Sequence, residues 1–348
     1  MKRALTGLTL EELGALIKGA GHPAFRAGQI HDWLQKGAGF EGMKNLPQAL
    51  LGELAAEYAA QGVRIEKTLR SKLDGTEKYL FALEDGNIVE GVFMRYAHGN
   101  TLCVSTQVGC RMGCAFCASG LEGLVRNMEP GEMLSQVLLA GALHREGQGR
   151  GVTNVVLMGS GEPLDNYENV LRFLRLLSAP RGMNISLRNV TLSTCGLVPE
   201  IDRLAGEDLP LTLSISLHAA DDGRRREIMP VAKLYSIGAL IESCKAYVKK
   251  TGRRVSFEYA LIQGVNSTLE EADALAELLR GFQCHVNLIP VNFVPEKGLT
   301  APGLGGIERF QARLQEKGVA VSRRREMGAD IGGACGQLRR RHIENSAN

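Results

Sequence analysis

The sequence lacks a long apolar run, has few aromatic residues and carries little net charge. Phe, Trp and Tyr together make up 5% of its 348 residues, and the formal net charge at pH 7 is +3. No stretch approaches the ~18 apolar residues that a membrane-spanning helix needs. The basic start Met1–Arg3 leads into the acidic segment Thr9–Glu12, unlike a secretory signal. These absences predict a globular protein of the cytoplasm with no membrane partner.

Nucleotide-binding glycine motifs are also missing. The turn Gly159–Gly161 begins like a dinucleotide-binding loop, but the third glycine would fall at Leu164, and Pro163 stands where the helix should begin. The lysine of a phosphate-binding loop is absent as well. The glycines instead let the backbone approach a ligand closely, and Glu162 is a candidate acceptor for an ammonium group. A tight turn between strand and helix is the alternative interpretation.

Cysteine, in contrast, is plentiful. Eight cysteines in a cytoplasmic chain favour metal or redox chemistry over structural disulfides. Three of them, Cys110, Cys114 and Cys117, lie within eight residues on a glycine-containing loop. This density is typical of thiols that surround one ion or cluster. Three ligands would leave one iron of a four-iron cluster open to a substrate. A zinc site completed by Cys103 or a distant residue, and reduced structural thiols, are the alternatives.

Short arginine runs bear on a nucleic-acid partner. Each run alone is best interpreted as a solvated face, but three runs on one chain favour a partner that carries phosphate. The runs are Arg224–Arg226, Arg323–Arg325 and Arg339–Arg341.

The N-terminal part of the chain has the apolar spacing of helices, and after about residue 60 apolar and polar residues alternate as in strands. Thr9 and Glu12 predict a capping box that opens the first helix, and Pro47–Ala59 reads as a third helix. Alternating residues around the turn signal Asp85–Gly86 predict a hairpin within a short β-meander. We therefore divide the chain into a helical N-terminal accessory domain that contacts RNA (1–60), a β-meander (61–100), a core barrel (101–325) and a C-terminal segment with a basic tail (326–348).

Strand-like and helical runs then alternate six times. Such alternation predicts a parallel sheet covered by helices, with ligands at the carboxyl ends of the strands. The expected strands are 102–107, 153–158, 189–194, 211–217, 255–262 and 285–291, and the expected helices are 130–146, 168–178, 199–205, 236–250, 268–281 and 306–317.

Each expected strand ends in small or polar residues. The cysteine loop follows the first strand, and the other ends are Gly159–Pro163, Ser193–Gly196, Ser216–His218, Gln263–Asn266 and Pro290–Asn292. His218 alone is more often a core or helix-capping histidine than a ligand. Cys195, Cys244 and Cys284 are most simply small buried hydrophobic residues. Near the C-terminus, glycines frame Cys335, which disfavours a helix or strand there, and we interpret this thiol as functional.

Taken together, these motifs resemble the radical S-adenosylmethionine (SAM) RNA methyltransferases, and in particular those that methylate adenine C2 in 23S rRNA and tRNA. The Cys-x3-Cys-x2-Cys spacing is that of the superfamily, and the resemblance covers nearly the whole chain. It implies an α/β fold with a partial (β/α)6 radical SAM barrel. The matching segments are Leu102–Ser105, Gly109–Cys117, Met158–Leu164, Ile215–Ala219, Asn287–Pro290 and Ala334–Leu338.

The resemblance also implies cofactors, partners and residue roles. One [4Fe-4S] cluster would be held by Cys110, Cys114 and Cys117, and two SAM molecules would be used per turnover. Cys335 would carry the methyl group, Cys103 would resolve the product and Glu90 would accept a proton, unless Glu90 simply faces solvent. The SAM contacts would be Gly161, Glu162, Ser193, Ser216, Leu217, His218 and Asn292. The expected partners are 23S rRNA, tRNA and an electron donor such as flavodoxin, and a monomer is expected.

The implied chemistry explains why two further cysteines are needed. Adenine C2 is electron-poor, so the electrophilic methyl of SAM cannot be transferred to it directly. The Cys335 thiolate would first take a methyl group. Hydrogen removal from that methyl by a SAM-derived radical would allow it to add to C2. Glu90 would then accept the C2 proton, and Cys103 would attack Cys335, which forms a disulfide and releases the RNA.

Two other functions compete with this hypothesis. The related C8 methyltransferases share the cysteines, but their pattern has alanine in place of Pro163. A non-catalytic iron–sulfur or zinc protein that binds RNA would give no role to Cys335 or Glu162.

Overall fold

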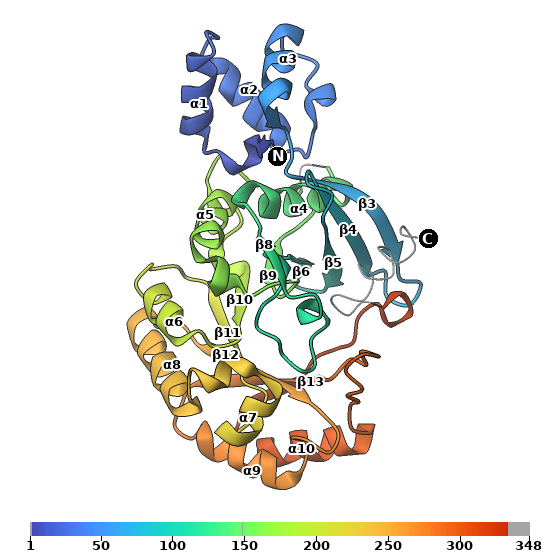
Figure 1. Ribbon diagram of the computed structural model, residues 1–348, viewed down its shortest axis with the longest axis vertical. Helices are drawn as coiled ribbons and strands as arrows, with labels where there is room; N and C mark the ends of the chain where they lie inside the picture. The colour runs from blue at the N-terminus through green and yellow to red at the C-terminus, as the bar shows by residue number, and fades with distance from the viewer. Residues whose placement is uncertain (1, 148, 333–348) are drawn as a thin grey trace.

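The computed structural model describes residues 2–147 and 149–332, and its centre is one curved sheet (Figure 1). Within these residues the sheet has ten strands in the order β14-β13-β12-β11-β10-β9-β6-β5-β4-β3. Every neighbouring pair from β14 to β6 is parallel, and every pair from β6 to β3 is antiparallel. The strands are β3 Val63–Arg70, β4 Glu77–Leu83, β5 Ile88–Tyr96, β6 Gly99–Cys103, β9 Asn154–Leu157, β10 Val190–Thr194, β11 Thr212–Ser216, β12 Val255–Leu261, β13 Cys284–Pro290 and β14 Val321–Arg323.

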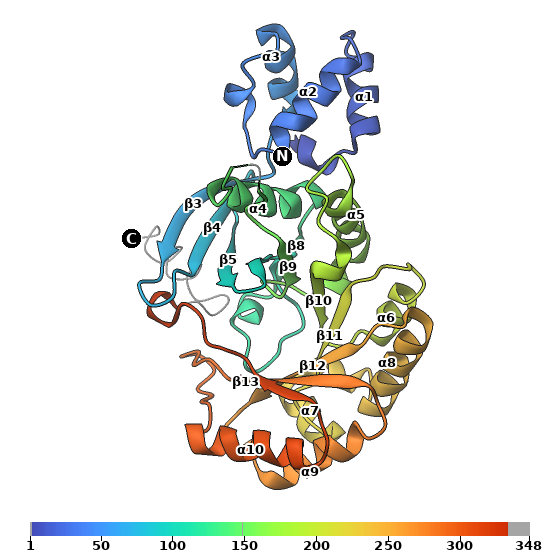
Figure 2. The ribbon, with the colours of Figure 1, turned by 180° about the vertical axis from the view of Figure 1, so that it is seen from behind.

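Helices cover the outside of the parallel part, so the molecule is a partial barrel (Figures 1 and 2). The main hydrophobic core lies between strands and helices, where Leu192, Leu174 and Leu275 are fully buried. The α/β barrel prediction is therefore confirmed, and the six expected strands and helices match the observed ones to within a few residues. The helices are α4 Pro130–Leu143, α5 Tyr167–Ser178, α6 Val198–Leu204, α8 Ile237–Thr251, α9 Leu269–Leu278 and α10 Leu304–Glu316.

Several short elements escaped the sequence patterns. The helix α7 (Asp222–Ile228) precedes α8, and the strands β7 (Gln107–Gly109) and β8 (Leu124–Asn127) form a separate antiparallel pair around the cysteine loop. The meander is also not a separate sheet, because its strands continue the sheet of the barrel through β6. None of the helices in the described ranges is both long and apolar enough to cross a membrane.

Three N-terminal helices form a small cluster with its own apolar core, above α4 in Figure 1. They are α1 Leu10–Gly19, α2 Phe25–Leu34 and α3 Gln48–Glu57. The predicted capping box is confirmed, since Glu12 N donates to Thr9 Oγ1 at 3.2 Å and Thr9 N donates to Glu12 Oε2 at 2.8 Å. Ser135 of α4 joins this cluster to the sheet: its Oγ lies 3.0 Å from Thr6 Oγ1 and accepts from Gly62 N at 2.8 Å.

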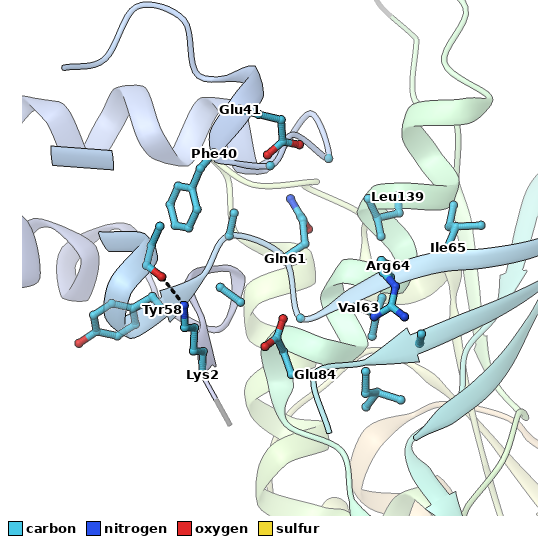
Figure 3. Close-up of a pocket in the computed structure, with 18 residues that line it drawn as sticks. Lys2, Phe40, Glu41, Tyr58, Gln61, Val63, Arg64, Ile65, Glu84 and Leu139 are labelled. Atoms are coloured by element: carbon cyan, nitrogen blue, oxygen red, sulfur yellow. Dashed lines mark hydrogen bonds between the residues drawn. The ribbon is translucent and has the colours of Figure 1, made fainter. Parts of the chain in front are cut away.

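A cavity of about 530 Å³ lies where these helices meet β3 and β4 (Figure 3). Its lining mixes both charge signs, from Lys2, Glu41, Arg64 and Glu84. Gln61 closes one side, with its Nε2 donating to Leu34 O and Ala38 O at 3.1 Å each. None of the candidate site residues lines this cavity.

Candidate active site

The candidate residues gather where the parallel strands end. The cysteine loop follows β6, Gly161 and Glu162 follow β9, and Ser193 lies near the end of β10. Ser216, Leu217 and His218 occupy the end of β11, and Asn292 follows β13 as an exposed residue. The carboxyl ends of parallel strands share one edge of the sheet, so these residues form one mouth.

The cysteine loop is held in place by backbone contacts. Gly109 has a φ of +77°, and a Cβ there would lie 2.0 Å from Gly123 O, so only glycine fits. Cys110 N donates to Gly123 O at 2.9 Å. Ala115 N donates to Ile228 O at 2.8 Å and so ties the loop to the end of α7.

The three thiols lie close enough to influence one another. Burial raises the pKa of Cys110 to about 12 and also raises the pKa of Cys114, and the charge of Cys117 adds to both effects. Thiolates here therefore need a compensating cation. Among the described residues, no three His, Cys, Asp or Glu side chains are grouped to hold one metal ion. A cubane binds its thiolates through separate irons, so this donor set fits an iron–sulfur cluster better than a zinc ion.

A buried serine joins three strands beside the mouth. Ser105 Oγ donates to Glu90 O at 2.7 Å and accepts from Ser160 N at 2.9 Å. Gln136 of α4 fixes the backbone of Ser105, accepting from its N at 3.1 Å and donating to its O at 3.0 Å. A Cβ at Gly159 would lie 2.7 Å from Ser105 N, so the two strand ends are in direct contact.

Glu162 is buried in the turn after β9. Its Oε1 accepts from Leu164 N at 3.1 Å and its Oε2 from Cys195 N at 2.7 Å. Burial raises the pKa of its carboxyl group. The preceding Gly161 has a φ of +104°, and a Cβ there would meet Gln107 at 2.5 Å. The side chains of Thr194 and Cys195 also donate to this carboxylate, so Glu162 holds the turn after β9 together with the end of β10.

His218 is buried and neutral at the end of β11. Its Nδ1 accepts from Ala260 N at 2.9 Å, which leaves the proton on Nε2. Burial, assisted by the charge of Arg225, lowers the pKa of His218 to about 3. The backbone has a φ of +59°, and Asn266 Nδ2 supports it by donating to His218 O at 2.7 Å. The sequence patterns gave neither Asn266 nor Arg225 a specific role.

Glu90 and Cys103 lie on the same face of the sheet. Glu90 is 5% exposed, so the interpretation that it faces solvent is wrong. Its Oε2 lies 2.9 Å from Lys78 Nζ, and both side chains are buried. Cys103 is 3% exposed and packs in an apolar cluster with Val92 and Met327.

The last described residues lie along the β3–β4 hairpin, where Figure 1 shows the red segment beside the blue strands. Asp330 accepts from Ser71 Oγ at 2.6 Å and from Lys72 N at 2.9 Å. Lys78 Nζ donates to Gly332 O at 2.7 Å, so one ammonium joins this segment to Glu90. Cys335 lies outside the described residues, three positions after Gly332.

Comparisons with known proteins give the context for this site. The model of the radical SAM superfamily matches residues 104–279. A probable dual-specificity RNA methyltransferase RlmN from Alkaliphilus oremlandii (strain OhILAs) is 52% identical and is aligned over 98% of both chains. The protein of the same name from Clostridium perfringens (strain 13 / Type A) is 52% identical over 97% of this chain and 96% of its own. The crystal structure of a radical SAM methyltransferase from Sphaerobacter thermophilus matches with a TM-score of 0.92 at 45% identity, covering 96% of this chain and 98% of that one.

The buried pair Lys78–Glu90 leads to a stability prediction. Replacing Lys78 with Met leaves a buried carboxylate without its ammonium and should lower the free energy of unfolding by about 3–5 kcal/mol. The double variant Lys78→Met/Glu90→Gln should recover most of this loss, because no charge of the pair remains. Denaturant unfolding measures both. Lys245→Met is the control, because it breaks an exposed pair with Glu242; an equally small effect at Lys78 would contradict the prediction.

Proposed function

The chain belongs to the radical SAM superfamily and, within it, to the dual-specificity RNA methyltransferase family RlmN, and from this premise we propose that it methylates C2 of adenine in both 23S rRNA and tRNA. The proposal rests on one observation: Glu90 and Cys103 lie on one face of the sheet, beside the segment that leads to Cys335. A methyltransferase that transferred the methyl group directly from SAM to RNA would need neither the Cys103 thiol nor the Cys335 thiol.

The family uses a [4Fe-4S] cluster and SAM. We assign the cluster to Cys110, Cys114 and Cys117, and the proximity of the Cys117 charge to the other two thiols supports the assignment. When bound, the cluster and SAM supply one-electron cleavage of SAM and a radical that removes a hydrogen atom.

We assign polar groups at the strand ends to SAM. Glu162 would accept from the SAM ammonium group, and Gly161 would allow the backbone to approach closely. His218 offers an Nε2–H donor. The other proposed contacts are Ser193, Ser216, Leu217 and Asn292.

The proposed methyl transfer depends on three residues of this chain. Cys335 takes a methyl group from one SAM, which makes two SAM molecules per turnover. After the methylene carbon has joined C2, the adduct would lose one electron to the oxidised cluster and the C2 proton to Glu90, whose carboxylate Lys78 Nζ orients from 2.9 Å. Cys103 would then attack the Cys335 sulfur: the S–S bond forms, the S–C bond breaks, and the released carbon takes up a proton and leaves as the methyl group of the RNA. We further propose a flavodoxin-type electron donor and a monomeric enzyme.

The position and identity of the methylated base test the function. Mass spectrometry of rRNA and tRNA from cells with and without this protein should detect 2-methyladenosine in both RNAs. The Cys335→Ala variant should give none, because the methyl carrier is lost. Methylation at C8 would support the related activity instead, and unmodified RNA would support a non-catalytic RNA-binding protein. A methyl group in only one of the two RNAs would contradict dual specificity.

The cluster assignment predicts which cysteines hold iron. Anaerobically purified protein should be brown and contain about four irons per chain. Cys114→Ala should lose most of the iron, because a ligand is removed. Cys195→Ala is a matched control, since Cys195 packs in the same apolar cluster as Cys114. Iron analysis and visible absorbance check this, and intact iron content in Cys114→Ala would defeat the assignment.

The role of Cys103 predicts a trapped intermediate. A thioether bridge between Cys335 and the adenine is inert to water, so the RNA is released only when a thiolate attacks the Cys335 sulfur. Cys103→Ala should therefore form a covalent protein–RNA species that survives reducing, denaturing electrophoresis and disappears on RNase digestion. The double variant Cys103→Ala/Cys335→Ala should form none. Normal turnover by Cys103→Ala would leave Cys103 as a buried strand residue only.

A further inference from the structure

Arg225 is a fully buried arginine that forms no ion pair with any carboxylate in the described part of the chain. Its exposed fraction is 0%, and its guanidinium donates only to backbone carbonyls: Nε to Leu217 O at 3.1 Å, and Nη2 to Cys195 O at 2.7 Å and Ser216 O at 3.4 Å. Its Nη1 has no hydrogen-bond partner among the described residues. A buried charge is costly unless an opposite charge compensates it.

The guanidinium of Arg225 lies close to the cysteine loop. The helix α7, which carries Arg225, is tied to this loop by the contact from Ala115 N to Ile228 O at 2.8 Å. Cys195, whose carbonyl accepts from Arg225, packs in one apolar cluster with Cys114. Cys195 therefore connects the guanidinium to the group of packed side chains that contains Cys114.

Asp222 attracts the guanidinium through its charge but forms no ion pair with it among the described residues. A peptide separates Glu162 from Arg225: Cys195 N donates to Glu162 Oε2, while Cys195 O accepts from Arg225 Nη2. Glu162 also accepts from Leu164 N, and we assign it to the SAM ammonium group. Neither carboxylate therefore neutralises the guanidinium by direct contact.

We propose that Arg225 is the fixed counter-charge of the iron–sulfur cluster and that it raises the reduction potential of the cluster. A four-iron core with three thiolate ligands is anionic, and one electron from the reductant makes it more negative. A buried cation nearby stabilises the more negative state more strongly, because a low-dielectric surrounding screens the attraction weakly. The inference rests on the assignment of the cluster to Cys110, Cys114 and Cys117, and not on the RNA that is methylated.

The test is the midpoint potential of the cluster in three variants, measured without SAM by redox titration followed by electron paramagnetic resonance. Arg225→Met removes the charge from a side chain of similar length and should lower the equilibrium constant for reduction about tenfold, which is about 59 mV for one electron. Arg225→Lys keeps the charge and should have a potential close to that of the unmodified protein. Arg226→Gln is the control, because it removes an exposed charge one residue along the same helix.

The outcomes separate the electrostatic role from a structural one. An unchanged potential in Arg225→Met with intact iron content would overturn the proposal, as would an equal shift in Arg226→Gln. A shift seen only after SAM is added would assign the charge to the SAM carboxylate instead and would also overturn it. If Arg225→Met loses its iron, Arg225→Lys decides: retained iron at the unmodified potential supports the proposal, whereas a lowered potential or lost iron contradicts it. Loss of RNA methylation alone would bear only on the proposed function.

Discussion

The site depends on the double pairing of β6. This strand pairs in parallel with β9 and antiparallel with β5, so the sheet changes direction at the strand that leads into the cysteine loop. Cys103, its last residue, stands opposite Val92 on one side and Val156 on the other. Because side chains alternate along a strand, Glu90 and Val92 share the face of Cys103. The meander thereby extends the inner face of the barrel and brings Glu90 and Cys103 beside the strand ends.

Two buried cations lie beside this mouth, and their surroundings differ. Lys78 has a carboxylate partner, Glu90, and also donates to the chain that leads to Cys335. Arg225 has only carbonyl partners in the part of the chain that the structure describes. Desolvation of a paired charge is offset within the protein, whereas an unpaired charge needs a ligand of opposite sign. This contrast is consistent with different roles: Lys78 holds groups of the protein together, and Arg225 balances the charge of a bound cofactor.

Much of the barrel could be predicted from the sequence, because the six strand–helix repeats carry local signals of period and length. The positions of Gly161, Ser193 and His218 at strand ends followed from this alternation alone. The union of the meander with the barrel was not predicted, because the division at residue 100 cuts through the hairpin of β5 and β6, and the alternating pattern does not show that β6 pairs on both of its edges. Lys78 was equally hidden: in an alternating strand a lysine reads as solvent-facing, and only its distant partners reveal that it is buried.

The run Arg224–Arg226 shows that adjacent arginines in the sequence can have different structural roles. Successive residues of a helix point about 100° apart, so three adjacent arginines cannot form one face. Arg224 forms ion pairs with Asp221 and Glu271, Arg225 turns into the interior, and Arg226 is exposed. The three arginines of this run therefore have three different environments: an ion pair, the protein interior and the solvent. This run therefore does not by itself form a continuous basic face for RNA phosphates.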